Sequence, residues 1–277
     1  MDNFFIIANS DKDPDKKITN EIAAYIEAHG KNCYIAQNDE RGHIISETVP
    51  SDIECGIVLG GDGTLIRAAR EMNEFDIPLL GINLGTLGYL TEVEIQDYKT
   101  VLNRLFSEKP QIEERMMLRG MLNQTISDIA LNDIVVSRAG ELRIVHFDIY
   151  VNGELFNSYS ADGIIISAPT GSTGYNLSAG GPIVSPTAKL IVITPICPHV
   201  LNKSSIVLSA DDIIDVVIGE SRDGSNERAV VTFDGAIMVP LTTGNKVRIQ
   251  QAEEVTKLIK VSNESFMKTM RNKMKGN

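Results

Sequence analysis

The residues best suited to chemistry stand together in the segment Gly60-Gly61-Asp62-Gly63-Thr64, directly after the apolar run 57–59. Three glycines allow positive φ angles and let the backbone approach a ligand closely. A helix that begins near Thr64 would direct its free N–H groups and its positive dipole end at the same place. The segment therefore predicts a site for phosphate groups.

Asp62 does not fit a simple anion site, because a carboxylate repels phosphate. It fits a general base that takes a proton from a hydroxyl, or a group that acts through a divalent cation. The alternative is a structural strand-to-helix turn in which Asp62 caps the helix. Arg67, one turn into that helix, is either a phosphate contact or a solvated cation. The segment has neither a Walker pattern nor a Gly-x-Gly-x-x-Gly pattern.

A second glycine-rich stretch runs from Asp162 to Pro182, and the apolar strand 164–167 leads into it. Its hydroxyl and backbone groups can form many hydrogen bonds with a polar ligand. Tyr175 offers a flat face on which a base can stack. The alternative is a long surface loop whose Ser and Thr side chains are only solvated.

A third candidate is the pair Asn132-Asp133 at the start of a strand. An Asn side chain can recognise an amide or an adenine edge, and an Asp side chain can accept hydrogen bonds from sugar hydroxyls or amines. Taken alone, the pair is also a common turn dipeptide.

The elements that must position these residues fall into two groups. The first hundred residues alternate between apolar strands and amphipathic helices, which is typical of a parallel α/β sheet. The expected strands are 4–9, 32–36, 53–59 and 78–83, and the expected helices are 15–29, 65–73 and 97–106.

After Pro110 the pattern changes to strand-like alternation with many β-branched residues. Expected strands include 115–122, 143–151 and 229–233, with a hairpin turn at Asn152-Gly153. We expect an α/β nucleotide-binding domain at 1–108 and a β-rich domain at 109–261. A last helix within 262–277 is expected to return to the first domain.

The charge and the cysteine content of the chain limit the binding partners and the compartment that we expect. The chain has 277 residues, a net charge of −11 and a pI near 4.9. Such a surface repels nucleic acid and anionic lipid, so we expect neither partner, and any anion site must be local. Cys33, Cys55 and Cys197 lie far apart and are odd in number, which indicates free thiols and a cytoplasmic protein. The sequence contains neither a signal-peptide pattern nor a membrane-length apolar run.

Taken together, the three motifs resemble the NAD kinase family. The segment 60–64 is similar to its first motif, Asn132-Asp133 to its middle motif, and 162–182 to its long glycine-rich motif. The strand and turn at 231–235 and the segment 193–199 also resemble family segments. The family pattern implies a Rossmann-like parallel α/β domain followed by a β-rich, β-sandwich-like domain.

The resemblance implies a reaction and a set of roles. Asp62 would take the proton from the adenosine 2′-hydroxyl of NAD, and Asn132 and Asp133 would hold the nicotinamide or the adenine side. ATP, or polyphosphate in some members, would donate the phosphoryl group with a divalent metal such as Mg²⁺. A homodimer or homotetramer is implied. The residues expected to bind ligand are Gly61, Asp62, Gly63, Thr64, Arg67, Asn132, Asp133, Arg143, Asp162, Thr173, Gly174, Tyr175, Asn176, Ser178 and Asp234, with no metal ligand assigned.

Two other readings stay open at this point. A lipid kinase of the diacylglycerol or sphingosine type shares the Gly-Gly-Asp-Gly-Thr turn. That group does not carry the loop found here at 171–175, and this chain lacks a basic amphipathic stretch for a membrane surface. A dinucleotide-binding regulator without catalysis would have lost Asp62, which is present. Against the family pattern, Gly174 replaces an Ala of many members and Asp133 a Glu, while Ser160 and Ala236 replace longer polar side chains of some members.

Overall fold

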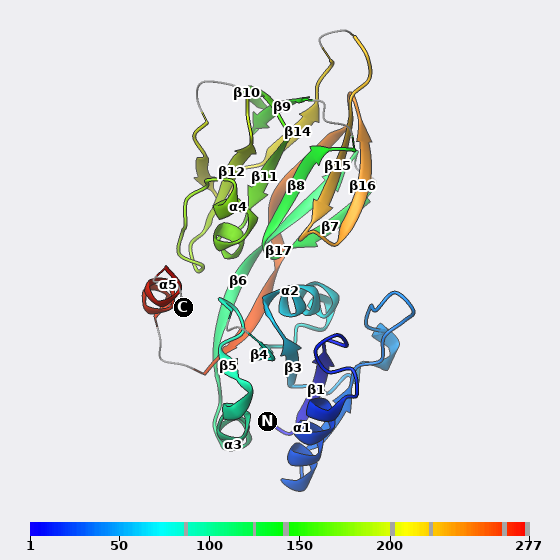
Figure 1. Cartoon of the computed structure of the whole chain (residues 1–277), viewed down its shortest axis with the longest axis vertical. Coiled ribbons are helices and arrows are strands. Elements are labelled where there is room, and N and C mark those ends of the chain that lie inside the picture. Colours follow the sequence, from blue (N-terminus) through cyan, green and yellow to red (C-terminus); the bar gives the residue numbers. More distant parts are fainter. Residues whose placement is uncertain are drawn as a thin grey trace. The chain divides into compact units, whose positions relative to one another are not determined.

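The computed structural model describes residues 1–85, 88–123, 126–140, 144–199, 203–221, 224–261 and 265–274. The chain divides into two compact units (Figure 1). Unit 1 contains Met1–Glu114 and Thr256–Asn277, and unit 2 contains Arg115–Val255. This division lies close to the boundaries expected from the sequence, while the binding role expected for each domain stays a prediction.

Unit 1 is built on a parallel sheet with the order β4-β3-β1-β2. β5 and the end of β17 also pair with β4. Almost every residue of β1, β3 and β4 is buried, as expected for a parallel sheet that is covered on both faces. The strands are β1 (Asn3–Ala8), β2 (Asn32–Ile35), β3 (Cys55–Gly60), β4 (Leu79–Asn83), β5 (Val93–Glu94) and β17 (Lys246–Lys260).

Helices cover both faces of this sheet (Figure 1). α1 (Lys17–Ala28) and α3 (Tyr98–Ser107) pack against one face through apolar residues such as Ile26 and Leu102. α2 (Asp62–Glu71) lies on the other face, where a Cβ on Gly81 would come within 2.7 Å of Leu65 Cδ1. The short turns are η1 (Ser46–Thr48), η2 (Asn73–Phe75) and η3 (Ile95–Asp97).

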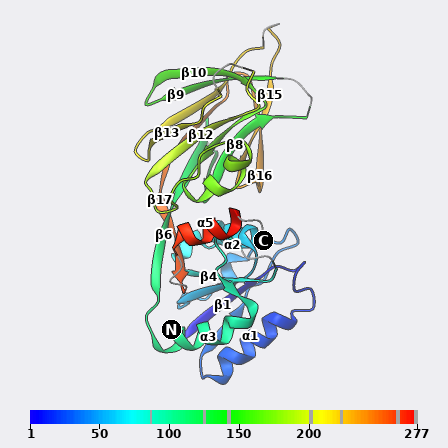
Figure 2. The ribbon, with the colours of Figure 1, turned by 60° about the vertical axis from the view of Figure 1, so that its left-hand side comes forward.

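The C-terminal helix α5 (Phe266–Met274) belongs to unit 1 and lies on the same side of the sheet as α2 (Figure 2). The Lys273 ammonium lies 4.6 Å from the ring centroid of Tyr89. None of the helices in the described part of the chain has the length and apolarity that a membrane crossing requires.

Unit 2 contains two sheets that enclose one apolar core. The first has the order β10-β9-β14-β17 and continues through β6 and β7, and the second has the order β13-β12-β11-β8-β15-β16. The first-sheet strands are β6 (Gln111–Leu122), β7 (Ile126–Ala130), β9 (Val145–Val151), β10 (Glu154–Ala161) and β14 (Ile214–Ile218). The second-sheet strands are β8 (Asp133–Arg138), β11 (Gly163–Ser167), β12 (Leu190–Ile196), β13 (Ile206–Ser209), β15 (Arg228–Phe233) and β16 (Ile237–Thr242).

Alternation along the second sheet separates its two faces. Ile134 and Val136 of β8 point into the core, beside Val231 and Phe233 of β15. Residues of the other parity, such as Val135, therefore lie on the outer face, which carries the pocket described below.

The hairpin expected at Asn152-Gly153 joins β9 to β10. Both residues have positive φ angles, 52° for Asn152 and 85° for Gly153, as a type I′ turn requires. This prediction is confirmed.

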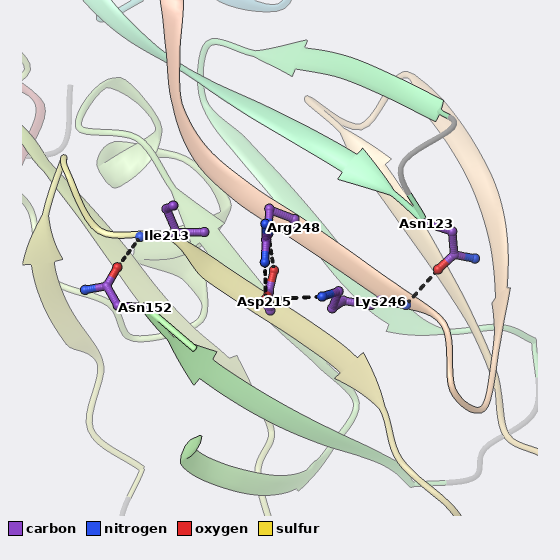
Figure 3. Close-up of polar contacts among 6 residues, drawn as sticks. All are labelled: Asn123, Asn152, Ile213, Asp215, Lys246 and Arg248. Carbon is purple, nitrogen blue, oxygen red and sulfur yellow. Dashed lines mark hydrogen bonds and ion pairs between the residues drawn. The ribbon is translucent and has the colours of Figure 1, made fainter. Parts of the chain in front are cut away.

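An ion-pair network ties β14 to β17 (Figure 3). Asp215 lies opposite Arg248 in the register, and Arg248 Nε and Nη2 donate to its carboxylate at 2.8 and 2.9 Å. The Lys246 ammonium lies 3.5 Å away from the same group. The hydrogen bonds from Arg248 hold the pKa of Asp215 below its usual range, so its charge is well compensated.

Candidate functional site

The glycine turn lies where β3 leads into α2, at the carboxyl edge of the parallel sheet. Gly61 is the helix N-cap and Asp62 the first helical residue, so the helix begins just before Thr64, near the expected start. The N–H groups of Thr64 and Leu65 donate to Gly61 O at 3.0 and 3.1 Å. Within the described residues the N–H groups of Asp62 and Gly63 remain as open donors at the positive end of the helix, which is a favourable place for an anion.

The Asp62 carboxylate does not cap its own helix. It accepts hydrogen bonds from the next loop, which follows β4. Its Oδ2 accepts the N–H of Tyr89 at 2.6 Å. Its Oδ1 accepts the N–H groups of Leu90 and Thr91 at 3.1 and 3.0 Å, and the Thr91 hydroxyl at 3.1 Å. The alternative role as a helix cap is therefore wrong, because the side chain anchors residues 89–91 instead.

This arrangement leaves one carboxylate oxygen with room for a substrate. A carboxylate oxygen has two lone pairs, and three donors already share Oδ1, whereas Oδ2 accepts only one bond from the described residues. Gly88 makes the arrangement possible, since a Cβ at that position would collide with the Asp62 carboxylate. Oδ2 is the atom that can accept a further hydroxyl proton.

The remaining residues of the first motif have different surroundings. Thr64 is buried, and its hydroxyl accepts a hydrogen bond from Asn9 Nδ2 at 3.0 Å. A Cβ on Gly60 would collide with the Thr64 side chain, so the close strand-to-helix turn requires glycine there. Arg67 is half-buried, and its Nη1 lies 3.7 Å from the position a Cβ would take on Gly42, so it extends toward that loop.

Unit 2 holds a pocket of about 330 Å³ on the outer face of its second sheet. The pair Asn132-Asp133, the glycine-rich stretch 162–182 and the turn at 231–235 all contribute to it, although they are far apart in the sequence. Its lining residues are Asn132, Asp133, Val135, Ser137, Tyr175, Thr232, Asp234 and Gly235.

Asp234 fixes the backbone at the edge of this pocket. Its carboxylate accepts the N–H groups of Leu131, Asn132 and Asp133 at 2.8, 2.8 and 3.0 Å. Asn132 Oδ1 is buried and has no hydrogen-bond partner among the described residues. A buried acceptor without a partner costs free energy, so this oxygen suits a ligand that brings an N–H group.

Asp133 is 6% exposed and faces the pocket from β8. Burial, and secondly the Asp234 carboxylate, raises the pKa of Asp133 to about 7. Near neutral pH this side chain is therefore present in both protonation states, and a ligand that donates a hydrogen bond favours the charged one.

The glycine-rich loop folds into two short turns, η4 (Thr170–Thr173) and α4 (Tyr175–Ser178). Asn176 holds them together. It is fully buried, its Nδ2 donates to Ser172 O at 3.2 Å and to Pro182 O at 2.9 Å, and its Oδ1 accepts the Thr194 hydroxyl at 2.7 Å. Because all its polar atoms are committed to the protein, Asn176 positions the loop, and the direct ligand contact expected of it is not favoured.

Tyr175 is the residue that this loop presents to the pocket. Its side chain is 48% exposed, as stacking on a base requires. Gly171 approaches Asn132 so closely that a Cβ would collide with the Asn132 carbonyl. Asn132 O also accepts the Ala168 N–H at 2.8 Å, so the loop and the middle motif form one packed group.

The other predicted residues of unit 2 that the structure describes are not part of the pocket lining. Asp162 pairs with Arg138, whose Nε lies 3.3 Å from Asp162 Oδ1. Thr173 and Ser178 belong to η4 and α4, but neither lines the pocket. Gly174 would place a Cβ 3.3 Å from Gly171 O, so an Ala there needs only a small adjustment. Arg143 lies outside the described residues.

The metal-ligating side chains of the described residues do not form a resident metal site. No group of three or more His, Cys, Asp or Glu side chains in that part of the chain could hold a metal ion. The Asp62 carboxylate already accepts four hydrogen bonds, three of them at Oδ1, and so offers a metal ion at most one oxygen.

Three residues around the glycine turn were not predicted from the sequence: Gly88, Thr91 and Lys12, whose Nζ lies 3.3 Å from the position that a Cβ would take on Gly61. Gly85 and Gly88 follow the expected strand 78–83 and indicate a turn there, but nothing in the sequence connects that turn to Asp62. Lys12 precedes the first motif by some fifty residues, and only the parallel pairing of β1 with β3 brings its loop to the glycine turn.

The chain thus combines an α/β unit, in which an open helix N-terminus lies beside a carboxylate, with a β-rich unit that holds a pocket. Models of the ATP-NAD kinase N-terminal and C-terminal domains match residues 14–109 and 131–261. The NAD kinases of Lachnospira eligens and Agathobacter rectalis are each 45% identical to the chain, and both alignments cover at least 99% of each protein. The chain belongs to the NAD kinase family and is a kinase.

Two solved structures share its fold. Yeast NADH kinase complexed with NADH has a TM-score of 0.83 and 23% identity, covering 100% of this chain and 88% of that one. An NAD kinase from Archaeoglobus fulgidus in complex with ATP has a TM-score of 0.80 and 22% identity, covering 99% and 98%. The expected two-domain fold is confirmed. Nothing in these comparisons supports the lipid-kinase alternative.

Proposed function

We propose that this enzyme transfers the terminal phosphoryl group of ATP to the adenosine 2′-hydroxyl of NAD, giving NADP and ADP. The observation that carries this proposal is Asp62, whose Oδ2 accepts only the Tyr89 N–H among the described residues and belongs to the first residue of α2, in a chain of this family. A carboxylate oxygen that can accept a proton and a helix end that favours anions, both at one corner of the sheet, support this proposal.

In the proposed step, Asp62 Oδ2 takes the proton of the 2′-hydroxyl while that oxygen bonds to the γ-phosphorus of ATP. The bond from this phosphorus to the bridging oxygen breaks, and ADP leaves with the electron pair. Phosphoryl transfer depends mainly on positioning and on charge stabilisation. The open N–H groups of Asp62 and Gly63 supply fixed donors for the phosphate oxygens, with Gly61, Thr64 and Arg67 proposed as their neighbours at the site.

The pocket of unit 2 is proposed to recognise the dinucleotide. Asn132 Oδ1 would accept an N–H of adenine or of the nicotinamide carboxamide, which would satisfy its orphaned acceptor. Asp133 and Tyr175 would add a hydrogen bond and a stacking surface, and Asp234 holds the backbone in place. Arg143, Asp162, Thr173, Gly174 and Ser178 remain proposed contacts of NAD.

Mg²⁺ is proposed to arrive with ATP as part of the substrate, since the described side chains offer no site of their own. Polyphosphate is a second possible donor. We also propose a homodimer or homotetramer, supported by exposed Leu155 and Phe156 on the edge strand β10. A cytoplasmic location is supported by the free thiols, among them the buried Cys55.

The first test is NADP formation by the purified protein with NAD, Mg²⁺ and either ATP or polyphosphate. We expect Asp62→Asn to lower kcat by about 10²–10⁴-fold, because an amide cannot accept the hydroxyl proton. Turnover of the variant within twofold of the wild type would refute the mechanism.

Asp62→Asn also disturbs residues 89–91, because an amide nitrogen would face backbone donors. Thr91→Val is the matched control, since it removes one hydrogen bond to Oδ1 and leaves the carboxylate intact. A comparable loss of kcat in Thr91→Val would mean that the loop, and not the base, is responsible. Phosphorylation of a lipid alcohol without NADP formation would favour the rejected alternative.

A further inference from the structure

The loop after β1 places a cation over the glycine turn. Lys12 Nζ lies 3.3 Å from the position a Cβ would take on Gly61, and also 3.3 Å from that position on Gly85. Gly61 follows β3 and Gly85 follows β4, so the ammonium lies between the carboxyl ends of two neighbouring parallel strands. In open α/β sheets, ligands bind at this edge.

Asn9 holds this loop in place. Asn9 Oδ1 accepts the N–H groups of Asp11 and Lys12 at 3.0 and 3.2 Å. Asn9 Nδ2 donates to the hydroxyl of Thr64, in the first turn of α2, at 3.0 Å. The backbone N–H of Asn9 donates to Leu59 O at 2.9 Å. Lys12 is thus tied through one side chain to the same strand and helix that carry the glycine turn.

Two carboxylates of this region, those of Asp13 and Asp62, have other partners. Asp13 accepts bonds from the N–H of Ile18 and from both donors of Thr19. Asp62 accepts bonds from residues 89–91. Among the described residues no acidic side chain forms an ion pair with Lys12, and its side chain is exposed. The ammonium is therefore available to an anion from solution.

We propose that Lys12 is a substrate-contact residue whose ammonium binds a phosphate chain at the glycine turn. The inference rests on the proposed function and supplies the cation that the first motif lacks. A compact ammonium suits phosphate oxygens, and the two glycines leave space for the phosphates beside it. With a net charge of −11, the chain needs such a local cation to hold a polyanion. The phosphate chain is either the ATP triphosphate or the NAD pyrophosphate.

Calorimetric titration of the full chain tests this without catalysis. The probes are ATP alone, NAD alone and inorganic tripolyphosphate, and the variant is Lys12→Met, which keeps the length of the side chain. Loss of a charged hydrogen bond in a partly open site should weaken binding roughly tenfold or more. Lys17→Met, an exposed lysine at the start of α1, is the matched control and should bind as the wild type does.

Each outcome bears on the proposal. Weaker ATP and tripolyphosphate binding with unchanged NAD binding assigns Lys12 to the donor, and weaker NAD binding alone assigns it to the pyrophosphate. Unchanged affinity for all three probes, or an equal loss in Lys17→Met, overturns the proposal. Wild-type protein that binds tripolyphosphate through Lys12 yet forms no NADP would support this contact while the proposed function fails. Wild-type protein that binds none of the probes overturns both.

Discussion

Asp62 and Asp234 use the same local arrangement in different units. Each is followed by glycine, and each carboxylate accepts three consecutive backbone N–H groups, those of residues 89–91 and 131–133. Both side chains therefore position a loop as well as a site. The Asp-Gly pairs were visible in the sequence, but their partners were not, because hydrogen bonds across 27 to 29 or 101 to 103 positions leave no local pattern.

Asp133 gives a pH-dependent prediction at this scale. Its pKa is raised to about 7, above its unfolded value near 3.8. Stability from this group is fully present below the unfolded value and is lost as the pH rises through the folded pKa. We expect Asp133→Asn to be more stable than the wild type at pH 8, by an amount on the order of a few kcal/mol, and similar at pH 4.

Urea denaturation at both pH values measures the difference. Asp211→Asn, at an exposed position in the same unit, should show little change at either pH. If the difference in unfolding free energy between Asp133→Asn and the wild type is the same at pH 8 and at pH 4, the raised pKa is contradicted. NAD affinity should fall in this variant although its stability rises.

At the scale of elements, the strongly periodic segments were predictable and the weakly patterned ones were not. The buried strands β1, β3 and β4 and the helices α1 and α3 appear close to where the sequence placed them. β10 was missed because its first five residues are exposed, so it lacks the alternation that marks a half-buried strand.

The glycine-rich loop shows a second limit. Its composition indicated a binding loop, and Tyr175 does line a pocket. Composition could not show that Asn176 turns inward, because its partner Thr194 lies on β12. Polar side chains that contact a ligand can therefore be distinguished from those that support the loop only when their burial is known.

We expect Asn176→Ala to destabilise unit 2 by roughly 2–4 kcal/mol, because the hydroxyl of Thr194 and the carbonyls of Ser172 and Pro182 lose their buried partner. The KM for NAD should rise at the same time, since Tyr175 adjoins the released turn. Denaturation curves and steady-state kinetics measure the two effects. Asn157→Ala, at an exposed position of β10, is the control. A rise in KM without loss of stability would point to direct ligand contact by Asn176.

At the scale of the whole molecule, unit 1 is built from two separate stretches of chain, and the whole of unit 2 lies between them in sequence. The second stretch contributes Leu258, which pairs with Leu79 of β4 and is 4% exposed. Ion pairs of Lys257 with Asp76 and of Lys260 with Glu92 lie on either side.

We expect Leu258→Ala to destabilise unit 1 by about 2–4 kcal/mol, through lost apolar burial and the cavity left behind. Thermal denaturation, followed with and without ATP, measures the change. Met267→Ala lies in the same C-terminal stretch at a 70% exposed position and should have little effect. Equal effects of the two substitutions would show that the returning strand does not stabilise unit 1.

The discontinuity of unit 1 also determines the order in which the two units can be completed during synthesis. A ribosome releases the chain from its N-terminus, and domains generally fold as units once their residues have emerged. Once Val255 has been synthesised, every residue of unit 2 is present. Unit 1 begins first, but at that moment it still lacks Leu258 and α5. Unit 2 can therefore be completed before unit 1, and a product truncated between the two events has every residue of the unit 2 pocket but lacks the last strand pairing and the last helix of unit 1.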